Sequence, residues 1–218
     1  MFNKLRPVWL VAGRELKDQF RDWRVLTPMI ILMVCFPFLM NEFAKQTVDF
    51  LNQYEANLIL DRLVPFSIMI IGFFPITISL VVALEAFVGE KERGTIEPVL
   101  SAPLDDWQLY FGKLLVGVAT PLAASYLSIT LYLIMIVQQG LEIPSFSIML
   151  QLILLTTAHA TLMVSAAIVI SVQSTSVKAA NLLASFIVIP VAILMQGEAV
   201  MLFWGNEDVL WLAVAGVM

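Results

Sequence analysis

The segment Leu114–Val137 reads LLVGVATPLAASYLSITLYLIMIV and contains no charged side chain. About 20 consecutive apolar residues allow one helix to cross the hydrocarbon core of a bilayer. The segment does not alternate apolar and polar residues with a period of two, as a strand of a membrane barrel would. Four other runs of this kind lie along the chain, at Val25–Met40, Leu63–Leu84, Phe146–Val172 and Ala179–Gln196. The sequence therefore predicts an all-α, polytopic helical membrane protein.

The amino-acid composition is that of a membrane protein. Of the 218 residues, 60% are hydrophobic and 13% are charged, whereas soluble domains have about 45–50% apolar and about 25% charged residues. This excludes a soluble enzyme and a disordered chain. The 12 Lys and Arg residues are scattered in a chain of net charge −5, so no nucleic-acid partner is expected. The one cysteine, Cys35, lies in an apolar run, which excludes a disulfide framework.

The last apolar run, Val209–Met218, is too short to cross a bilayer. It carries no charge or capping residue that would end a helix, so we expect the sequence to stop inside a sixth span; the alternative is an interfacial segment. Residues 25–218 are therefore predicted to form a single transmembrane domain with five complete spans and a sixth begun at the C-terminus.

Lysine and arginine residues predict the orientation, because cytoplasmic loops carry an excess of them. The segment before the first span is basic and contains Lys4, Arg6, Arg14, Lys17, Arg21 and Arg24. We therefore expect a cytoplasmic N-terminus in the cell (inner or plasma) membrane. The segments expected outside are Asn41–Arg62, Gln138–Ser145 and Gln196–Asp208.

The residues before the first span, 1–24, predict an amphipathic helix. Its apolar face, with spacings of three and four residues, contains Trp9, Ala12, Leu16, Phe20 and Trp23. Indole rings beside cations are typical of the boundary between headgroups and hydrocarbon. We expect this helix to lie on membrane lipids as an interfacial anchor. The alternative is an ordinary juxtamembrane helix.

The segment between the second and third spans predicts a short structured motif. Gly94 follows a charged helical end, where a left-handed residue commonly ends a helix. Thr95 is a candidate N-cap for a short second helix, with Glu97 in its first turn. Asp105 and Gln108 have the spacing of a capping box for the next helix.

The short second helix is expected to carry a small apolar stripe. Ile96, Val99 and Leu100 form the stripe, and Pro103 ends the helix. Together with the charged residues before Gly94, this predicts a rigid helix–turn–helix suited to docking on a soluble partner. A solvated charged hairpin is the alternative.

A family resemblance favours the docking role. The string GEKERGTIE at residues 89–97, followed by VLSAPL at residues 99–104, resembles the cytoplasmic signature of ABC transporter permeases of the type-2 exporter class. The stretch RELKD at residues 14–18 resembles the family's elbow helix. The resemblance implies that residues 88–108 contact a cytoplasmic ATP-binding subunit. The implied coupling residues are Glu90, Lys91, Glu92, Arg93, Gly94, Thr95, Ile96, Glu97, Val99, Leu100 and Pro103.

The resemblance also implies the assembly and the division of labour. Two permeases, either identical copies or paralogues, would form a dimer and bind ABC ATP-binding subunits, which would hold ATP and magnesium. The chain has no Gly-x-x-x-x-Gly-Lys-Ser/Thr loop, so we expect no catalytic residue, cofactor or metal in it. The leading hypothesis is an exporter permease. A haem-export-type permease of cytochrome c maturation and a non-transporting membrane assembly subunit are the alternatives.

Polar side chains in the fourth span are candidates for the translocation path. They are Thr156, Thr157, His159 and Ser165. Ionisable groups inside a membrane are functional candidates, whereas hydroxyls also hold helices together. For His159, a buried interhelical hydrogen bond is the alternative to lining the path. The sequence does not indicate the substrate.

Overall fold

The computed structural model describes residues 2–53, 57–94, 104–204 and 207–217. Every regular element in these ranges is a helix, which confirms the predicted all-α class. In chain order the helices are α1 (Phe2–Arg21), α2 (Trp23–Gln53), α3 (Asn57–Glu92), α5 (Asp106–Gln138), α6 (Phe146–Gln173), α7 (Val177–Trp204) and α8 (Glu207–Val217).

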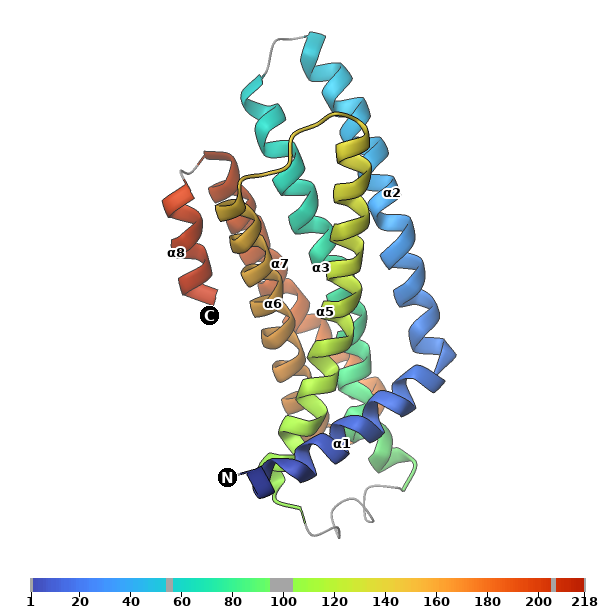
Figure 1. The fold of residues 1–218 in the computed structure, drawn as a ribbon. Helices are drawn as coiled ribbons and strands as arrows, with labels where there is room; N and C mark the ends of the chain where they lie inside the picture. Colours follow the sequence, from blue (N-terminus) through green and yellow to red (C-terminus); the bar gives the residue numbers. More distant parts are fainter. Residues whose placement is uncertain (1, 54–56, 95–103, 205–206, 218) are drawn as a thin grey trace.

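Figure 1 shows α2, α3, α5, α6 and α7 running along one bundle. α3 packs against all four of the others. α1 runs across one end of the bundle, where it packs on α5, and α8 folds back along α6 and α7. We call the end crossed by α1 the α1 end. It contains the C-termini of α3 and α6 and the N-termini of α5 and α7.

Four helices of the described part are long and apolar enough to cross a membrane. They lie at Leu26–Leu51, Asp106–Gln138, Phe146–Gln173 and Val177–Trp204, and they contain most of the first predicted run and all of the third, fourth and fifth. α3 contains the second predicted run and packs among these helices. α8 has 11 residues. The count of five complete spans stays a prediction.

Two helices extend beyond the spans predicted for them. α2 continues to Gln53, so residues 41–53 are helical. Ala44 and Leu51 are buried, because an apolar face continues through this polar stretch. α7 continues past Gln196 to Trp204, which places Glu198 inside a helix. The chain is therefore helical over most of these two segments, and their place outside the membrane stays a prediction.

A side-chain donor compensates for one of the prolines inside the helices. Pro37 has no amide hydrogen, so the carbonyl of Met33, four residues earlier in α2, loses its usual helical donor. The Ser128 hydroxyl of α5 donates to that carbonyl at 3.0 Å. This hydrogen bond satisfies the carbonyl and joins α2 to α5.

α1 approaches α5 closely at a glycine. A Cβ atom at Gly112 would lie 2.7 Å from Val11 Cβ and 3.2 Å from the Val8 carbonyl, so only glycine fits there without a shift. Val8 and Ala12 are buried in the described structure. Close backbone approach at small residues is typical of helix pairs in membranes.

The face predicted for the N-terminal helix is only partly correct. Trp9, Leu16 and Phe20 are exposed on α1, with Trp9 69% exposed, whereas Ala12 is buried. Trp23 is exposed but belongs to α2. The break occurs at Asp22, whose amide bonds to Asp18 of α1 and whose carbonyl accepts from the first turn of α2.

Candidate functional site

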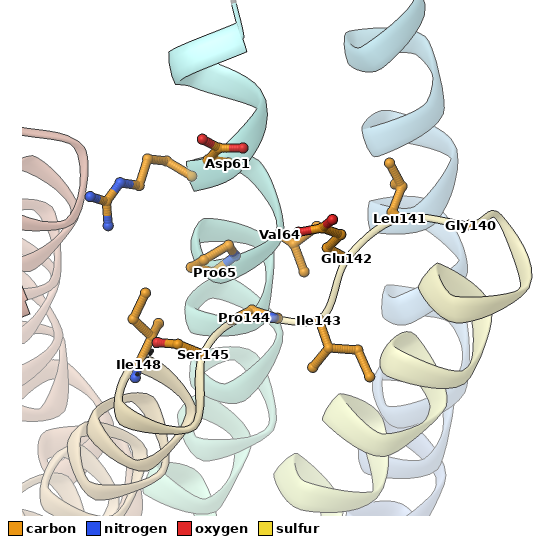
Figure 2. A pocket seen from close by; sticks show the side chains of 11 residues that line it. Asp61, Val64, Pro65, Gly140, Leu141, Glu142, Ile143, Pro144, Ser145 and Ile148 are labelled. Atoms are coloured by element: carbon orange, nitrogen blue, oxygen red, sulfur yellow. Dashed lines mark hydrogen bonds between the residues drawn. The ribbon is translucent and has the colours of Figure 1, made fainter.

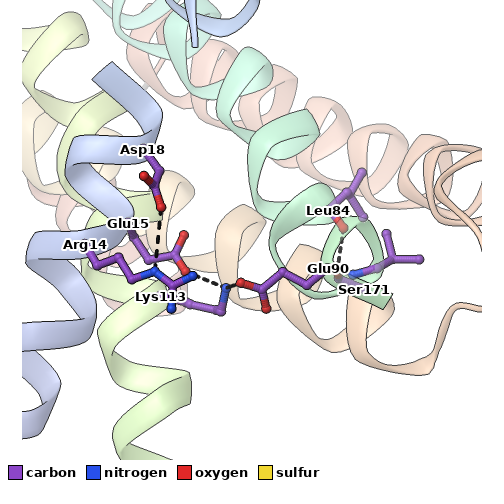
Figure 3. A network of polar contacts seen from close by, with 8 residues as sticks. Arg14, Glu15, Asp18, Leu84, Glu90, Lys113 and Ser171 are labelled. Atoms are coloured by element: carbon purple, nitrogen blue, oxygen red, sulfur yellow. Dashed lines mark hydrogen bonds and ion pairs between the residues drawn. The ribbon is translucent and has the colours of Figure 1, made fainter. Parts of the chain in front are cut away.

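Lys113 is the centre of a buried ion-pair network at the α1 end. Its side chain is only 2% exposed. Nζ lies 2.6 Å from Glu15 Oε1 of α1 and 3.2 Å from Glu90 Oε1 of α3, as Figure 3 shows. A buried ammonium requires such partners, because removing its charge from water is costly. The Lys113 network (Glu15, Glu90 and Lys113) therefore joins three helices at one point.

Lys91, next to Glu90 in the chain, joins α3 to the end of α6. Its Nζ donates to the carbonyl of Val172 and, at 3.4 Å, to that of Ser174. The last carbonyls of a helix lack helical donors and carry the negative end of the helix dipole, so a cation is favourable there. Ser171 adds a second connection, because its hydroxyl accepts from the Val88 amide at 3.0 Å and donates to the backbone of α3.

Glu92 joins α3 to the start of α7. Its Oε1 accepts a hydrogen bond from the amide of Val177, the first residue of α7, at 2.7 Å. The first amides of a helix lack helical partners and carry the positive end of the dipole. Three consecutive residues, Glu90 to Glu92, thus connect the end of α3 with α5 and α1, with α6, and with α7.

The coupling residues predicted from the sequence divide at Gly94. Gly94 has a φ of +67°, which confirms the left-handed residue expected after the helix. Arg93 is exposed beside it. The remaining members lie outside the described residues, and so does the short second helix predicted from them: Thr95, Ile96, Glu97, Val99, Leu100 and Pro103.

In the structure, the donor to the Glu92 carboxylate is the backbone of α7. The free amides of α7 lie against the end of α3, so they satisfy the carboxylate within the chain.

The capping arrangement predicted for α5 is present, because the Asp105 amide donates to Gln108 Oε1 at 3.1 Å.

The four path candidates on α6 are not brought together. Thr156 is buried and packs against α3, where a Cβ at Gly72 would lie 2.8 Å from its hydroxyl. Thr157 shares a hydrogen bond of 2.6 Å with the Tyr126 hydroxyl of α5. Thr157 and Ser165 also line a cavity of about 320 Å³ that Val217 of α8 borders. His159 instead faces α7.

His159 of α6 and Glu198 of α7 form a buried pair. Nε2 and Oε1 lie 3.3 Å apart, and the side chains are 5% and 4% exposed. The Phe73 ring of α3 meets the imidazole edge to face, with centroids 6.1 Å apart. Within the described ranges, no three His, Cys, Asp or Glu side chains group so as to hold a metal ion.

Glu198 and Lys113 are buried, paired residues that the sequence patterns do not single out. In the sequence both resemble loop charges, on opposite sides of the membrane. The signal for Glu198 is the apolar sequence on both sides of it, VAILMQ before and AVMLFW after, which continues the fifth run. For Lys113, the signal is its place directly before the run Leu114–Val137.

A comparison with protein families identifies the kind of protein. The sequence profile of the ABC-2 family transporter proteins matches residues 9–205. The chain belongs to this family. It is therefore a permease, a multi-pass membrane subunit of an ABC transporter that is not itself catalytic. A comparison with curated proteins gives no match.

The end of the permease opposite α1 carries an open cavity of about 460 Å³, lined by both polar and apolar residues (Figure 2). It lies between the start of α3 and the connection from α5 to α6, and its charged lining residues are Asp61, Arg62 and Glu142. The two carboxylates are exposed. Ser145 lies at its floor and caps α6, accepting from the Ile148 amide at 3.4 Å. The bundle therefore ends on this side in an open cavity with charged side chains in its lining.

Proposed function

We propose that this permease forms the translocation path of an ATP-driven exporter and is driven by a separate ATP-binding subunit. That partner would bind ATP and magnesium and would dock on the end of α3 and the residues that follow it. The α1 end would face the cytoplasm, with α1 as the elbow helix at the inner leaflet of the cell membrane. The contacts of the α3 terminus support this proposal.

The observation that carries the proposal is the set of contacts made by Glu90, Lys91 and Glu92. Each residue connects the end of α3 to a different neighbour: α5 and α1, α6, or α7. A force applied to Arg93 or Gly94 would therefore reach four other helices through charged contacts. A free loop at this place would absorb the same force.

The distribution of exposed side chains supports the proposed orientation. Trp9 and Phe20 are exposed on α1, in line with a helix at the lipid headgroups. The N-terminal basic residues lie at this end of the bundle, as the positive-inside rule expects for the cytoplasmic side.

A second permease chain is part of the proposal. One set of helices is too small to enclose a path that opens alternately to either side. α2 and α7 have the least buried spans: only 22% and 17% of their apolar stretches are buried. Both helices therefore offer wide apolar faces to a second copy, a paralogue or lipid. Nothing in the described contacts favours a haem exporter or a non-transporting assembly subunit.

Two glycines at opposite ends of the bundle give a matched experiment. Gly94 and Gly140 have φ values of +67° and +74°, and a Cβ added at either would have no atom within 4 Å. Valine at either site forces the same backbone strain. We expect affinity purification of the tagged permease from its native membrane to recover magnesium-dependent ATPase activity with wild type and Gly140→Val, and about tenfold less with Gly94→Val.

The amount of permease in the membrane, measured in the same preparation, is the control. Membrane-inserted permease should be equal in all three samples, because neither glycine lies in a span. Equal ATPase recovery with Gly94→Val and Gly140→Val would remove the coupling role from the end of α3. Absence of any ATPase activity with the wild-type chain would contradict the proposal as a whole.

A further inference from the structure

Glu198 is the one ionisable side chain among the residues that α7 buries. The others are Ala180, Ala184, Val191 and Leu202. α7 has the least buried of the four apolar spans, and it packs on α3 and α6. Glu198 adds a polar contact to α6, at His159.

The Glu198 carboxylate lacks the donors that a buried charge needs. His159 Nε2 is 3.3 Å from Oε1, but neither carboxylate oxygen accepts a hydrogen bond from any described residue. The third helix at this place contributes the apolar ring of Phe73. A permanent structural anchor would satisfy the carboxylate, since a buried and poorly paired charge destabilises the packed state.

Other charges do not compensate for the pair within the described chain. On the helices that pack against α6 or α7, the described ionisable side chains are Asp61, Arg62, Glu90, Lys91 and Glu92 on α3, Asp106, Tyr110, Lys113, Tyr126 and Tyr132 on α5, and Lys178 on α7. No ion pair joins Glu198 to Arg62 or Lys178, and Lys178 lies 20 residues away at the other end of α7. The charge of the pair is thus set by its own protons.

A net charge left on this buried pair would weaken the packing of α7 on α6, because such a charge is costly away from water. A neutral imidazole beside a carboxylate has a net charge of −1. One added proton brings the net charge of the pair to zero, whether it forms an imidazolium or a carboxylic acid. When that proton leaves to water, one negative charge remains at a dry interface. Ionisable residues inside membranes commonly serve as such proton sites.

We propose that His159 and Glu198 form a proton-binding site that holds α7 against α6, and that α7 separates from α6 when the site loses its proton. Separation would bring water to the carboxylate and remove the cost of the buried charge. The site is a property of the permease chain alone and does not depend on an ATP-binding partner.

Distances between spin labels test this proposal directly. Leu162 on α6 and Ile193 on α7 are exposed, 41% and 63%, and are the label sites in a Cys35→Ser background. In lipid nanodiscs we expect one short distance at pH 6 and a second, longer distance at pH 10. A control pair on α5 and α6, Leu127 and Leu162, should keep one distance at both pH values.

Two variants assign the change to this site. Glu198→Gln keeps the shape but never carries a negative charge, so the short distance should persist at pH 10. Should this variant fold poorly, the apolar pair His159→Phe with Glu198→Leu predicts the same pH-independent short distance. A wild-type distance that does not change between pH 6 and pH 10 would overturn the proposal, as would a change of the same size in both variants.

Discussion

Lys113 of α5 and Glu15 of α1 are 98 residues apart in sequence, yet Nζ and Oε1 lie 2.6 Å apart. The same ammonium reaches Glu90 of α3, so α1, α3 and α5 meet at one buried cation. Because α1 otherwise packs mainly on α5, this contact makes it part of the same unit as the α3 terminus.

Replacing Lys113 by methionine should destabilise the permease. Two carboxylates would remain close together without their cation, which we expect to lower the free energy of unfolding by about 2–4 kcal/mol. Thermal unfolding in detergent would show this as a lower midpoint. Lys45→Met is the matched control, since Lys45 pairs with Glu42 on an exposed surface and its loss should have almost no effect.

The same position offers a rescue. Adding Glu15→Gln and Glu90→Gln to Lys113→Met removes the uncompensated charges, so much of the lost stability should return. An effect of Lys113→Met no larger than that of Lys45→Met would show that the network does not hold α1 in place.

Gly112→Ala should push α1 away from α5. The new Cβ would lie 2.7 Å from Val11, and overpacking of this kind costs about 1–3 kcal/mol. Gly197→Ala serves as the comparison, because a Cβ at Gly197 has no atom within 4 Å and alanine favours the helix. The melting midpoint of the detergent-solubilised permease should fall in the first variant only. Equal midpoints would contradict the close approach of α1.

Ser128→Ala should leave the Met33 carbonyl without a donor and cost about 1 kcal/mol. In a Pro37→Ala background the restored amide of residue 37 can donate to the same carbonyl, so Ser128→Ala should then cost less. A double-mutant cycle of unfolding free energies measures this coupling. Strict additivity would mean that Ser128 does not compensate for Pro37.

The proposed orientation predicts opposite labelling at the two ends of the bundle. Lys178 is exposed at the α1 end and Glu142 is exposed at the opposite end. Single cysteines at these positions, in a Cys35→Ser chain, should react with a membrane-impermeant maleimide on intact cells at 142 and only after lysis at 178. Reaction at 178 on intact cells would reverse the topology.

The sequence is sufficient to predict the helices but not their ends and contacts. Uncharged runs such as Leu114–Val137 require helices, because a bilayer leaves the backbone no other donors. The extensions of α2 and α7 escape prediction since charged residues on one face of a helix look like a loop when the other face is not yet known. Gly94 is predictable, because its left-handed conformation is a local property.

The long-range pairs could not be predicted from local patterns. Lys113 is one of several basic residues near span ends, and only the crossing of α1 over α5 shows that it is buried. Glu198 meets His159 because α6 and α7 are antiparallel and in register at that point. Both pairings depend on helix packing, which the linear sequence does not display.

The most direct test of the central claim is photo-crosslinking from Arg93. A photoreactive amino acid at this exposed position, incorporated in the permease in its native membrane, should form a covalent adduct with an ATP-binding subunit, identified by mass spectrometry. The same amino acid at Glu142, in the cavity at the opposite end of the bundle, should form no adduct with an ATP-binding subunit. An adduct from position 93 with an ATP-binding protein is the result we predict. Absence of that adduct, with efficient photolysis and normal insertion, would contradict coupling through the end of α3.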